Sequence, residues 1–589
     1  MAGLRPGSGT TTMMKPIIEE GQPTGRSGPG QALPSWLAAL IVAALFLAVH
    51  LLVFRPGYAV NDDISMIAIA AGYPGGQPLP FLMFSNVLLG LLLNLLYRLP
   101  GALNWEIWIF LTLQFLSVWG LLAVILSGPW RRTWKAVGIL LVVSCASTFL
   151  LEITFTTTAG LTALAGCCLI LAACRARAEV DRKLLAFGGL LIFAGSLVRL
   201  ESALLALLLM LPLLGLGRGA FRYRYLAFGL LAAGLLVAGG FVFDRLYLAA
   251  SPAWQTFAIY NQARSAVQDT PRLANLGSAI RQVNWSANDL KMFAHWFFPD
   301  AHTFSLPRLD YLIRHVPGTT TSLGGAIRSA AGRWLSLTAS PYVLSLAGLW
   351  LALLAFARRR RTVLSLSVLT LALLALSVAL AWSAKLPNRV LELLLVDGLL
   401  FGFFLLAWSE PSGRLKPFVG RAAGIVVGLL LAAALVLVVG RAVLDTRASR
   451  SEQSAYRQIL SQLDGLGRSG VLPADALVVS PAYGIPLEWA NPLVLDFPQV
   501  AYLDLGWKTF SPVYDRLLRQ RGAASLDGGL LAGGKLFLMS STDLANGVAQ
   551  FLQEHDQARV TALPLYSLPN APAAPEYDDV HLFRFVPAP

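Results

Sequence analysis

The sequence predicts a mainly α-helical membrane protein, a polytopic bundle of transmembrane helices followed by a small C-terminal α/β domain. Of its 589 residues, 56% are hydrophobic and only 13% are charged, whereas soluble domains average about 25% charged residues. Apolar runs of 15 to 25 residues recur between residues 35 and 440, which is the pattern of many spanning helices. After residue 445, charges, prolines and short apolar runs indicate a soluble domain.

The N-terminal 33 residues are rich in Gly, Pro, Ser and Thr and predict a disordered tail. The first apolar run begins after this tail and is long enough to span, so it is not a cleaved signal peptide. The net charge of +14 does not predict nucleic-acid binding, because Lys and Arg lie in short loops between apolar runs, where they set topology. The four cysteines fall within or at the ends of apolar runs and are expected to be packing residues; they are Cys145, Cys167, Cys168 and Cys174.

About eleven transmembrane spans are predicted. They lie at 35–54, 106–126, 136–151, 159–174, 184–198, 202–216, 225–248, 338–356, 362–382, 389–408 and 418–440. The apolar run 81–97 is left out of this count. It follows GYPGGQPLP, is short and carries Asn86 and Asn94, which favours a juxtamembrane helix packed on the bundle.

The basic loops set the orientation of the bundle. Most loop Lys and Arg lie in alternate connections, at 128–135, 174–183, 217–224, 357–361 and 409–417, and such loops stay in the cytoplasm. If 81–97 does not span, the N-terminus is cytoplasmic, and the loops 55–104 and 251–335 and the domain 445–589 are extracytoplasmic. If 81–97 spans, Asp62 faces the cytoplasm instead. We favour the first arrangement, in a multi-pass protein of the plasma (inner) membrane.

Charged residues at three predicted outer turns are candidates for a site. The spans 184–198 and 202–216 are short and meet at Arg199 and Glu201, so their turn is expected to line a cavity below the surface. A simple ion pair between these two residues is the alternative. Lys385 and Arg389 share a face if their turn is helical, or they only contact lipid headgroups. Glu152 marks the third turn.

The segment Asn61-Asp62-Asp63 follows the first span directly. A carboxylate at an outer cavity can act as general base on a hydroxyl, and cations opposite can stabilise a phosphate leaving group. Adjacent carboxylates disfavour joint ionisation, which raises one pKa. The alternative is that these acids only cap a helix, since Asp suits an N-cap and the first turn.

The two predicted soluble regions carry no recognisable catalytic motif. The loop 251–335 contains WQTFAIYNQAR and VNWSANDLKMFAHWFFPD, which predict packed interfacial helices. His295, Asp289 and Asp300 lie there without metal-ligand spacing. In the C-terminal domain, 476–481, 535–540 and 580–585 predict strands, and 511–522 and 542–556 predict helices. No phosphate loop, GxGxxG or Ser-His-Asp constellation is present.

With one span, an acidic pair in the first outer loop, a juxtamembrane helix, a long outer loop and a C-terminal outer domain, the chain resembles the GT-C glycosyltransferases. These polytopic enzymes take sugars from polyprenyl-phosphate carriers. The resemblance implies that Asp62 is the general base and Asp63 its neighbour. We expect that no cofactor is required, and a divalent metal is left open. The resemblance also implies a polyprenyl-phosphate-linked sugar donor and a glycan, lipid or protein acceptor. The chain lacks the His-Pro-Pro and WWD-type motifs of better-known branches, which indicates a less characterised bacterial branch.

On this reading, Arg199, Lys385 and Arg389 are the cations expected at the carrier phosphate, while Glu152 and Glu201 are the next candidates for the base. Other functions remain open. A lipid or polysaccharide transporter or flippase would use buried charges as a relay, but no internal repeat is evident. A polysaccharide polymerase or ligase would share the outer site. A non-catalytic assembly scaffold is a further alternative.

Overall fold

The computed structural model of the protein describes residues 33–99, 101–175, 179–215, 221–270, 272–317, 322–337, 348, 360–383, 385–409, 417–481, 484–567 and 579–588. The predicted N-terminal tail lies outside these residues except for Leu33. The span predicted at 338–356 lies outside them except for Gly348.

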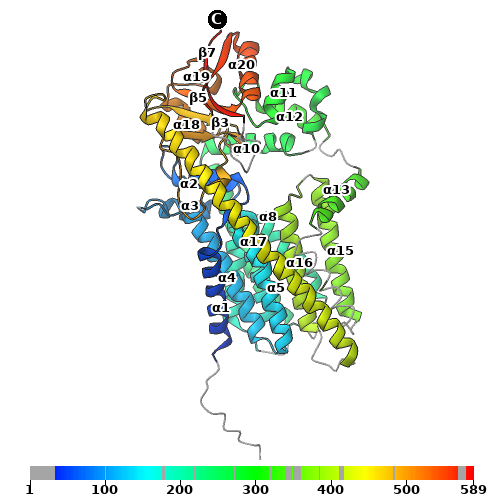
Figure 1. The fold of residues 1–589 in the computed structure, drawn as a ribbon. Coiled ribbons are helices and arrows are strands. Elements are labelled where there is room, and N and C mark those ends of the chain that lie inside the picture. Colours follow the sequence, from blue (N-terminus) through cyan, green and yellow to red (C-terminus); the bar gives the residue numbers. More distant parts are fainter. Residues whose placement is uncertain are drawn as a thin grey trace, which may run out of the picture.

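A helical bundle forms the body of the molecule, as the sequence predicts (Figure 1). Its helices are α1 (Ser35–Leu52), α4 (Trp105–Ser127), α5 (Arg132–Leu151), α6 (Phe155–Ala173), α7 (Arg182–Val198), α8 (Leu200–Leu214), α9 (Tyr223–Ala249), α15 (Arg360–Trp382), α16 (Asn388–Ser409) and α17 (Pro417–Arg468). Among the described residues, eight helices are long and apolar enough to cross a membrane. The chain is therefore built as a multi-pass membrane protein.

Two bundle helices are shorter than a bilayer core is thick. α7 has 17 residues and α8 has 15, which gives lengths of about 26 Å and about 22 Å against a core of about 30 Å. They join through the single extended residue Arg199, with φ −158° and ψ 113°. The predicted short helical pair is confirmed.

The apolar run 81–97 contains only one short helix, α3 (Val87–Leu96). At 10 residues it is about 15 Å long, so it does not reach across a bilayer. Asn86 caps it by accepting from the backbone N–H of Leu88 at 3.0 Å, and Asp244 of α9 accepts from that of Val87 at 2.8 Å. This length agrees with the prediction that the run does not span.

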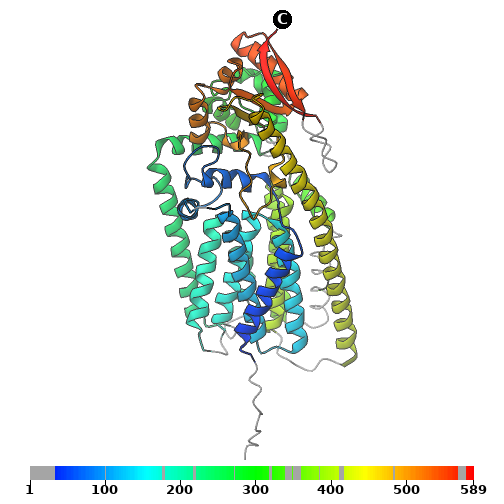
Figure 2. The same cartoon turned by 60° about the vertical axis from the view of Figure 1, so that its left-hand side comes forward.

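One end of the bundle carries most of the remaining elements (Figures 1 and 2). The strands β1 (Gly57–Tyr58) and β2 (Glu152–Ile153) pair in parallel there. The loop 251–335 folds into helices, as predicted. The elements at this end are α2 (Asn61–Ala71), α10 (Pro252–Gln268), η1 (Leu273–Ser278), η2 (Ile280–Val283), α11 (Ala287–Ala294), α12 (Leu306–His315) and α13 (Leu323–Ser336).

The C-terminal domain is α/β, with five strands in the order β4-β3-β5-β7-β6. β3 runs parallel to β4 and β5, while β7 runs antiparallel to both β5 and β6. Its elements are β3 (Leu477–Ser480), η3 (Leu487–Trp489), β4 (Ala501–Asp504), η4 (Gly506–Lys508), α18 (Pro512–Gln520), α19 (Leu526–Leu531), β5 (Leu536–Ser541), α20 (Thr542–Asp556), β6 (Val560–Ser567) and β7 (Val580–Pro587). The five predicted elements are confirmed, and β4, β6 and α19 are additional.

The helix that contains the last predicted span continues beyond residue 440. α17 continues without a break to Arg468 and carries the chain from the bundle into the C-terminal domain (Figure 1). The apolar run stops where predicted, but the charged sequence after it contains neither Gly nor Pro until Gly465, so nothing ends the helix. The domain boundary at 445 therefore falls inside one helix.

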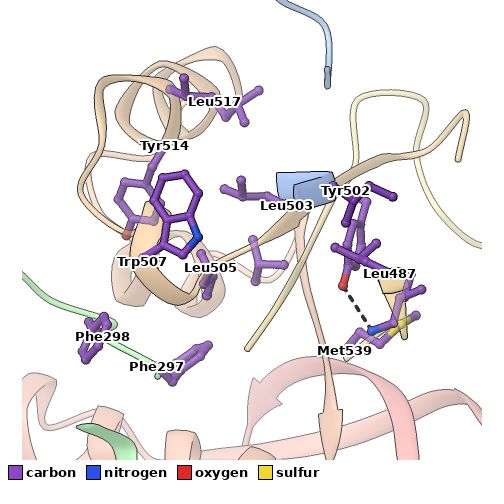
Figure 3. Close-up of a cluster of buried hydrophobic side chains, with 14 of the residues drawn as sticks. Phe297, Phe298, Leu487, Tyr502, Leu503, Leu505, Trp507, Tyr514, Leu517 and Met539 are labelled. Carbon is purple, nitrogen blue, oxygen red and sulfur yellow. Dashed lines mark hydrogen bonds between the residues drawn. The ribbon is translucent and has the colours of Figure 1, made fainter. Parts of the chain in front are cut away.

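The C-terminal domain and the loop helices share one hydrophobic core. Buried side chains of α2, α10 and α11 pack in the same cluster as those of β3, β5 and α20. In Figure 3, Phe297 and Phe298 of the long loop lie beneath Leu505 and Trp507 of the domain. A second core fills the bundle and contains all four cysteines, which are buried and free as expected.

Candidate functional site

The acidic pair lies in the first turn of α2. The N-cap is Val60, and no side chain caps the helix, so neither aspartate is an N-cap. Both still lie at the positive end of the helix dipole, which favours acids. α2 ends at Gly72 with φ 79°, where a Cβ atom would lie 2.7 Å from backbone atoms of residues 76–78. Glycine at this position turns the chain back under α2.

Asp63 is fully buried and holds a neighbouring helix. Its Oδ1 accepts a hydrogen bond from the backbone N–H of Phe155, the first residue of α6, at 3.0 Å. Its Oδ2 has no hydrogen-bond partner among the described residues. Burial raises the pKa of Asp63 to about 7, against the opposing effect of the Phe155 hydrogen bond. Asp63 thus connects α2 to α6.

Asp62 is partly buried and lies among charges from distant parts of the chain. Burial raises its pKa, while the positive charges of Arg389 and Arg199 and a hydrogen bond from Trp507 offset part of this rise. The indole N–H is the donor, since Trp has no acceptor. A carboxylate beside two arginines, with one hydrogen bond holding it, has the protonation chemistry of a general base.

Arg199 lies under this aspartate at the junction of α7 and α8. Its Nη1 donates to Thr156 Oγ1 at 2.7 Å, and its guanidinium stacks on the Phe155 ring at 4.7 Å. The predicted ion pair with Glu201 exists, but at 3.8 Å and with Glu201 77% exposed. Such an exposed contact contributes little to stability, and Arg199 keeps a cationic face near Asp62.

The two other predicted cations differ from each other. Arg389 lies in the first turn of α16, close enough to affect the pKa of both Asp62 and Asp63. Its Nε is buried without a hydrogen-bond partner in the described part of the chain. Lys385 is exposed and precedes α16, which begins at Asn388. The shared helical face expected for this pair is therefore not formed.

A third arginine joins this group from the long loop, and sequence reasoning missed it. Arg264 of α10 is 2% exposed and lies close enough to Asp62 for their charges to interact. It donates to Asn261 Oδ1 and Gln268 Oε1, both at 2.9 Å, and stacks on Trp296 at 4.4 Å. The sequence feature that could have identified Arg264 is its place at the end of WQTFAIYNQAR, a segment with several aromatic residues.

The C-terminal domain reaches this site through one short segment, 504–508. Trp507 donates to Asp62, and Asp504, at the carboxyl end of β4, accepts from Ser65 one turn further along α2. Lys508 is 3% exposed and pairs with Asp504. The carboxyl end of a parallel strand is a common place for a site, and here it lies against the acidic helix.

Glu152 belongs to a separate ionic group. It accepts from Arg441 Nη2 at 2.6 Å, and Arg441 also approaches Asp445 at 3.4 Å and Glu392 at 3.8 Å. These contacts tie β2 to α16 and α17. Of the Arg199/Glu201 turn, which was expected to line a cavity, Glu201 lines one and Arg199 is not among the lining residues.

In the described part of the chain, one group of three side chains is arranged to hold a metal ion, namely Asp289, Glu554 and His555. Their atoms already make contacts between α11 and α20. His555 Nε2 contacts Asp289 Oδ1 at 2.9 Å, and Glu554 Oε2 accepts from Ser286 at 2.8 Å. Asp289 also completes the capping box of α11. The group is explained by this helix contact.

No protein-family model matches the chain, and no curated protein matches it. Among solved structures, it is similar to the crystal structure of ArnT from Cupriavidus metallidurans bound to undecaprenyl phosphate. The match has 13% sequence identity and a TM-score of 0.40, and covers 94% of this chain and 98% of that chain.

Proposed function

We propose that the chain is an integral-membrane glycosyltransferase that moves a sugar from a polyprenyl-phosphate carrier to an acceptor hydroxyl at the outer face of the membrane. The observation that carries the proposal is the position of Asp62, a partly buried carboxylate beside Arg199 and Arg389. A base and a set of cations in one place are what transfer from a sugar phosphate to a hydroxyl needs.

In the proposed reaction, Asp62 removes the proton of the acceptor hydroxyl as its oxygen attacks the anomeric carbon of the sugar. The bond from that carbon to the phosphate oxygen breaks, and the polyprenyl phosphate leaves with the bonding electron pair. Arg389 and Arg199 stabilise the charge on the leaving phosphate. Trp507 orients the Asp62 carboxylate through its indole N–H. The step requires no cofactor.

The arrangement of side chains around Asp62 favours sugar transfer over the charge relay of a transporter. The helix α2, which contains Asp62, lies at the end of the bundle that carries the C-terminal domain (Figure 1). The partners of Asp62 come from α7–α8, α16 and η4. Such a convergence of distant elements on one carboxylate supports a chemical site. The proposed sidedness follows from the basic loops.

Asp62→Asn tests the proposal, because it keeps the shape of the side chain and removes the base. We expect sugar transfer to fall by about 10²–10⁴-fold, with expression and carrier binding retained. Transfer is measured in proteoliposomes that hold sugar-labelled polyprenyl phosphates and a bacterial envelope lipid extract. Asp63→Asn is the matched control and should be milder. Near wild-type transfer by Asp62→Asn would place the base elsewhere, with Glu201 and Glu152 next.

A further inference from the structure

A cavity of about 560 Å³ lies beside the candidate site, on the α9–α10 side of Arg199. Four parts of the chain enclose it: the segment 81–87 before α3, Glu201 of α8, the end of α9 and one face of α10. A volume of this size suits one small headgroup rather than a whole lipid. Neither the acidic pair nor Arg389 lines it.

The α10 face of the cavity is polar and regularly spaced. Gln255, Ala258, Gln262 and Ser265 follow one another at intervals of three or four residues and line the cavity, as residues on one helical face do. At one end Trp254 stacks on Phe81, with ring centroids 4.7 Å apart. Amide, hydroxyl and aromatic groups together form the kind of wall that hydroxylated rings contact through hydrogen bonds and ring faces.

The charges of this cavity disfavour a phosphate. Glu201 and Asp244 line it, with Arg245 as the cation. Arg245 lies over the Phe241 ring at 5.1 Å, and Asp244 already accepts from the backbone N–H of Val87. Glu201 is 77% exposed and only 3.8 Å from Arg199 at its nearest. An anion would meet an excess of negative charge here, whereas a neutral polyol would find acceptors for its hydroxyls.

The cavity is connected to Asp62 through shared wall residues. Phe84 lines it and stacks on Phe155, with centroids 5.7 Å apart, and its ring meets Trp507 edge-on at 5.5 Å. Asn261 also lines it and accepts from Arg264. Phe84 therefore connects the cavity wall to Trp507, which donates to Asp62, while Arg199 and Arg389 lie beside Asp62 and not in the cavity wall.

The outer edge of the cavity meets an exposed apolar surface. Leu248 and Ala249 at the end of α9 line it, and the preceding turns of that helix expose Phe241, Val242 and Leu246 by 41%, 53% and 66%. On a membrane helix such a face contacts lipid. A molecule with a polar head and an apolar tail matches both surfaces.

We propose that this cavity binds the acceptor of the reaction, as the uncharged, hydroxylated headgroup of an amphipathic molecule, and presents its hydroxyl to Asp62. The inference rests on the proposed function for the role of the occupant, but the binding itself is tested separately. In this arrangement the acceptor approaches Asp62 from the cavity, and the carrier phosphate lies on the other side of Asp62, beside Arg199 and Arg389.

Protection from cysteine labelling tests the cavity directly. The native cysteines are buried, so Ala258→Cys places a single reactive thiol on the cavity wall of the full chain in nanodiscs. We expect n-octyl-β-D-glucoside, below its micelle concentration, to slow maleimide labelling several-fold. Octyl phosphate and octanol, which share its tail, should not. Ala524→Cys, on an exposed position of the C-terminal domain, is the control and should be unaffected.

A second variant distinguishes binding in the cavity from coating of the surface. Adding Gln262→Leu to Ala258→Cys should raise the glycoside concentration for half-protection about fivefold, the effect of one lost hydrogen bond. Gln553→Leu, on exposed α20, should not change it. Equal protection by octyl phosphate, or none by the glucoside, overturns the assignment. Protection by the glucoside alone, together with full transfer by Asp62→Asn, refutes the proposed base and leaves the cavity assignment intact.

Discussion

Neighbouring carboxylates in α2 have different surroundings, and this difference separates their roles. Asp63 is fully buried and accepts from the backbone N–H of Phe155. Asp62 is partly buried and has two arginines and an indole around it. Protonation of Asp63 removes the cost of burying a charge and leaves Oδ1 able to accept from Phe155, so Asp63 is suited to hold structure. Asp62 lies beside two cations and a hydrogen-bond donor that favour its ionised form and offset part of the effect of burial, so it is suited to take a proton.

Asp63→Asn should therefore change the pH dependence of stability. The pKa of Asp63 is about 7 when folded and about 3.9 when unfolded. Between these values the folded state holds a proton that the unfolded state has lost, so stability falls as pH rises, by up to about 1.4 kcal/mol per pH unit. The contribution is fully present below pH ~4 and is lost as pH passes 7.

Thermal unfolding at pH 5 and pH 8 checks this prediction. Wild type should lose more stability over this interval than Asp63→Asn, whose amide oxygen still accepts from Phe155 and has no charge to bury. Asp63→Ala loses that hydrogen bond as well and should be less stable at both pH values. Parallel pH dependences for wild type and Asp63→Asn would show that Asp63 stays ionised in the folded protein.

Arg389→Ala should weaken binding of the carrier phosphate more than Lys385→Ala does. Arg389 lies beside Asp62 and its buried Nε has no hydrogen-bond partner among the described residues, so it is available to an anion. Lys385 is exposed outside the helix. Losing a charge-assisted hydrogen bond costs about 1.5–3 kcal/mol, or roughly ten- to hundredfold in Kd for a short-chain polyprenyl phosphate. Equal losses of affinity in both variants would contradict this prediction, because they would show that only the overall positive charge of the surface matters.

At the scale of elements, η4 brings the C-terminal domain into contact with α2. Its Trp507 donates to Asp62, and the preceding Asp504 accepts from Ser65. Figure 3 shows Trp507 packed beside Tyr514 within the apolar core of the domain. The indole is thus held by the fold of the domain and not by α2.

Trp507→Phe should shift the acid limb of the rate profile upward. The indole hydrogen bond lowers the pKa of Asp62, so its loss raises that pKa and a higher pH is needed to ionise the base. We therefore expect the acid limb of the profile to lie at higher pH in Trp507→Phe than in wild type. The measurement is kcat/KM against pH. Trp119→Phe, which loses a hydrogen bond to Trp36 on the bundle surface, should leave the profile unchanged.

Sequence patterns predicted the positions of the helices and strands better than the contacts between them. Hydropathy alone placed α1 and α4 through α9 within a few residues, because a spanning helix needs a continuous apolar run. It ended α17 too early, because helix propensity continues after hydropathy stops. In the site, Asp62 was recognisable from its position after the first span. Arg264 and Trp507 were not, since they reach Asp62 only through packing of segments about 200 and 445 residues further along the chain.

At the scale of the whole molecule, several contacts fix the C-terminal domain to the bundle. Along α17, Arg441 binds Glu152, Gln453 donates to the carbonyl of Pro56, and Tyr456 donates to that of Asp496. These contacts follow one helix from the bundle into the domain (Figure 1). Because buried side chains of α2 belong to the core that it shares with the domain, the domain and the acidic pair lie at the same end of the bundle.

Labelling from one side of the membrane checks this arrangement and its proposed direction. Gln77→Cys, after α2, and Ala524→Cys, in the C-terminal domain, are exposed positions at one end of the molecule, and Thr133→Cys is exposed at the other. In right-side-out spheroplasts, an impermeant maleimide should label the first two variants and should label Thr133→Cys only after permeabilisation, because the basic loop 128–135 stays inside. Buried native cysteines give no background.

Labelling of Ala524→Cys but not Gln77→Cys would contradict the structure. The reverse sidedness for all three would keep the structure and move the proposed chemistry to the cytoplasmic face.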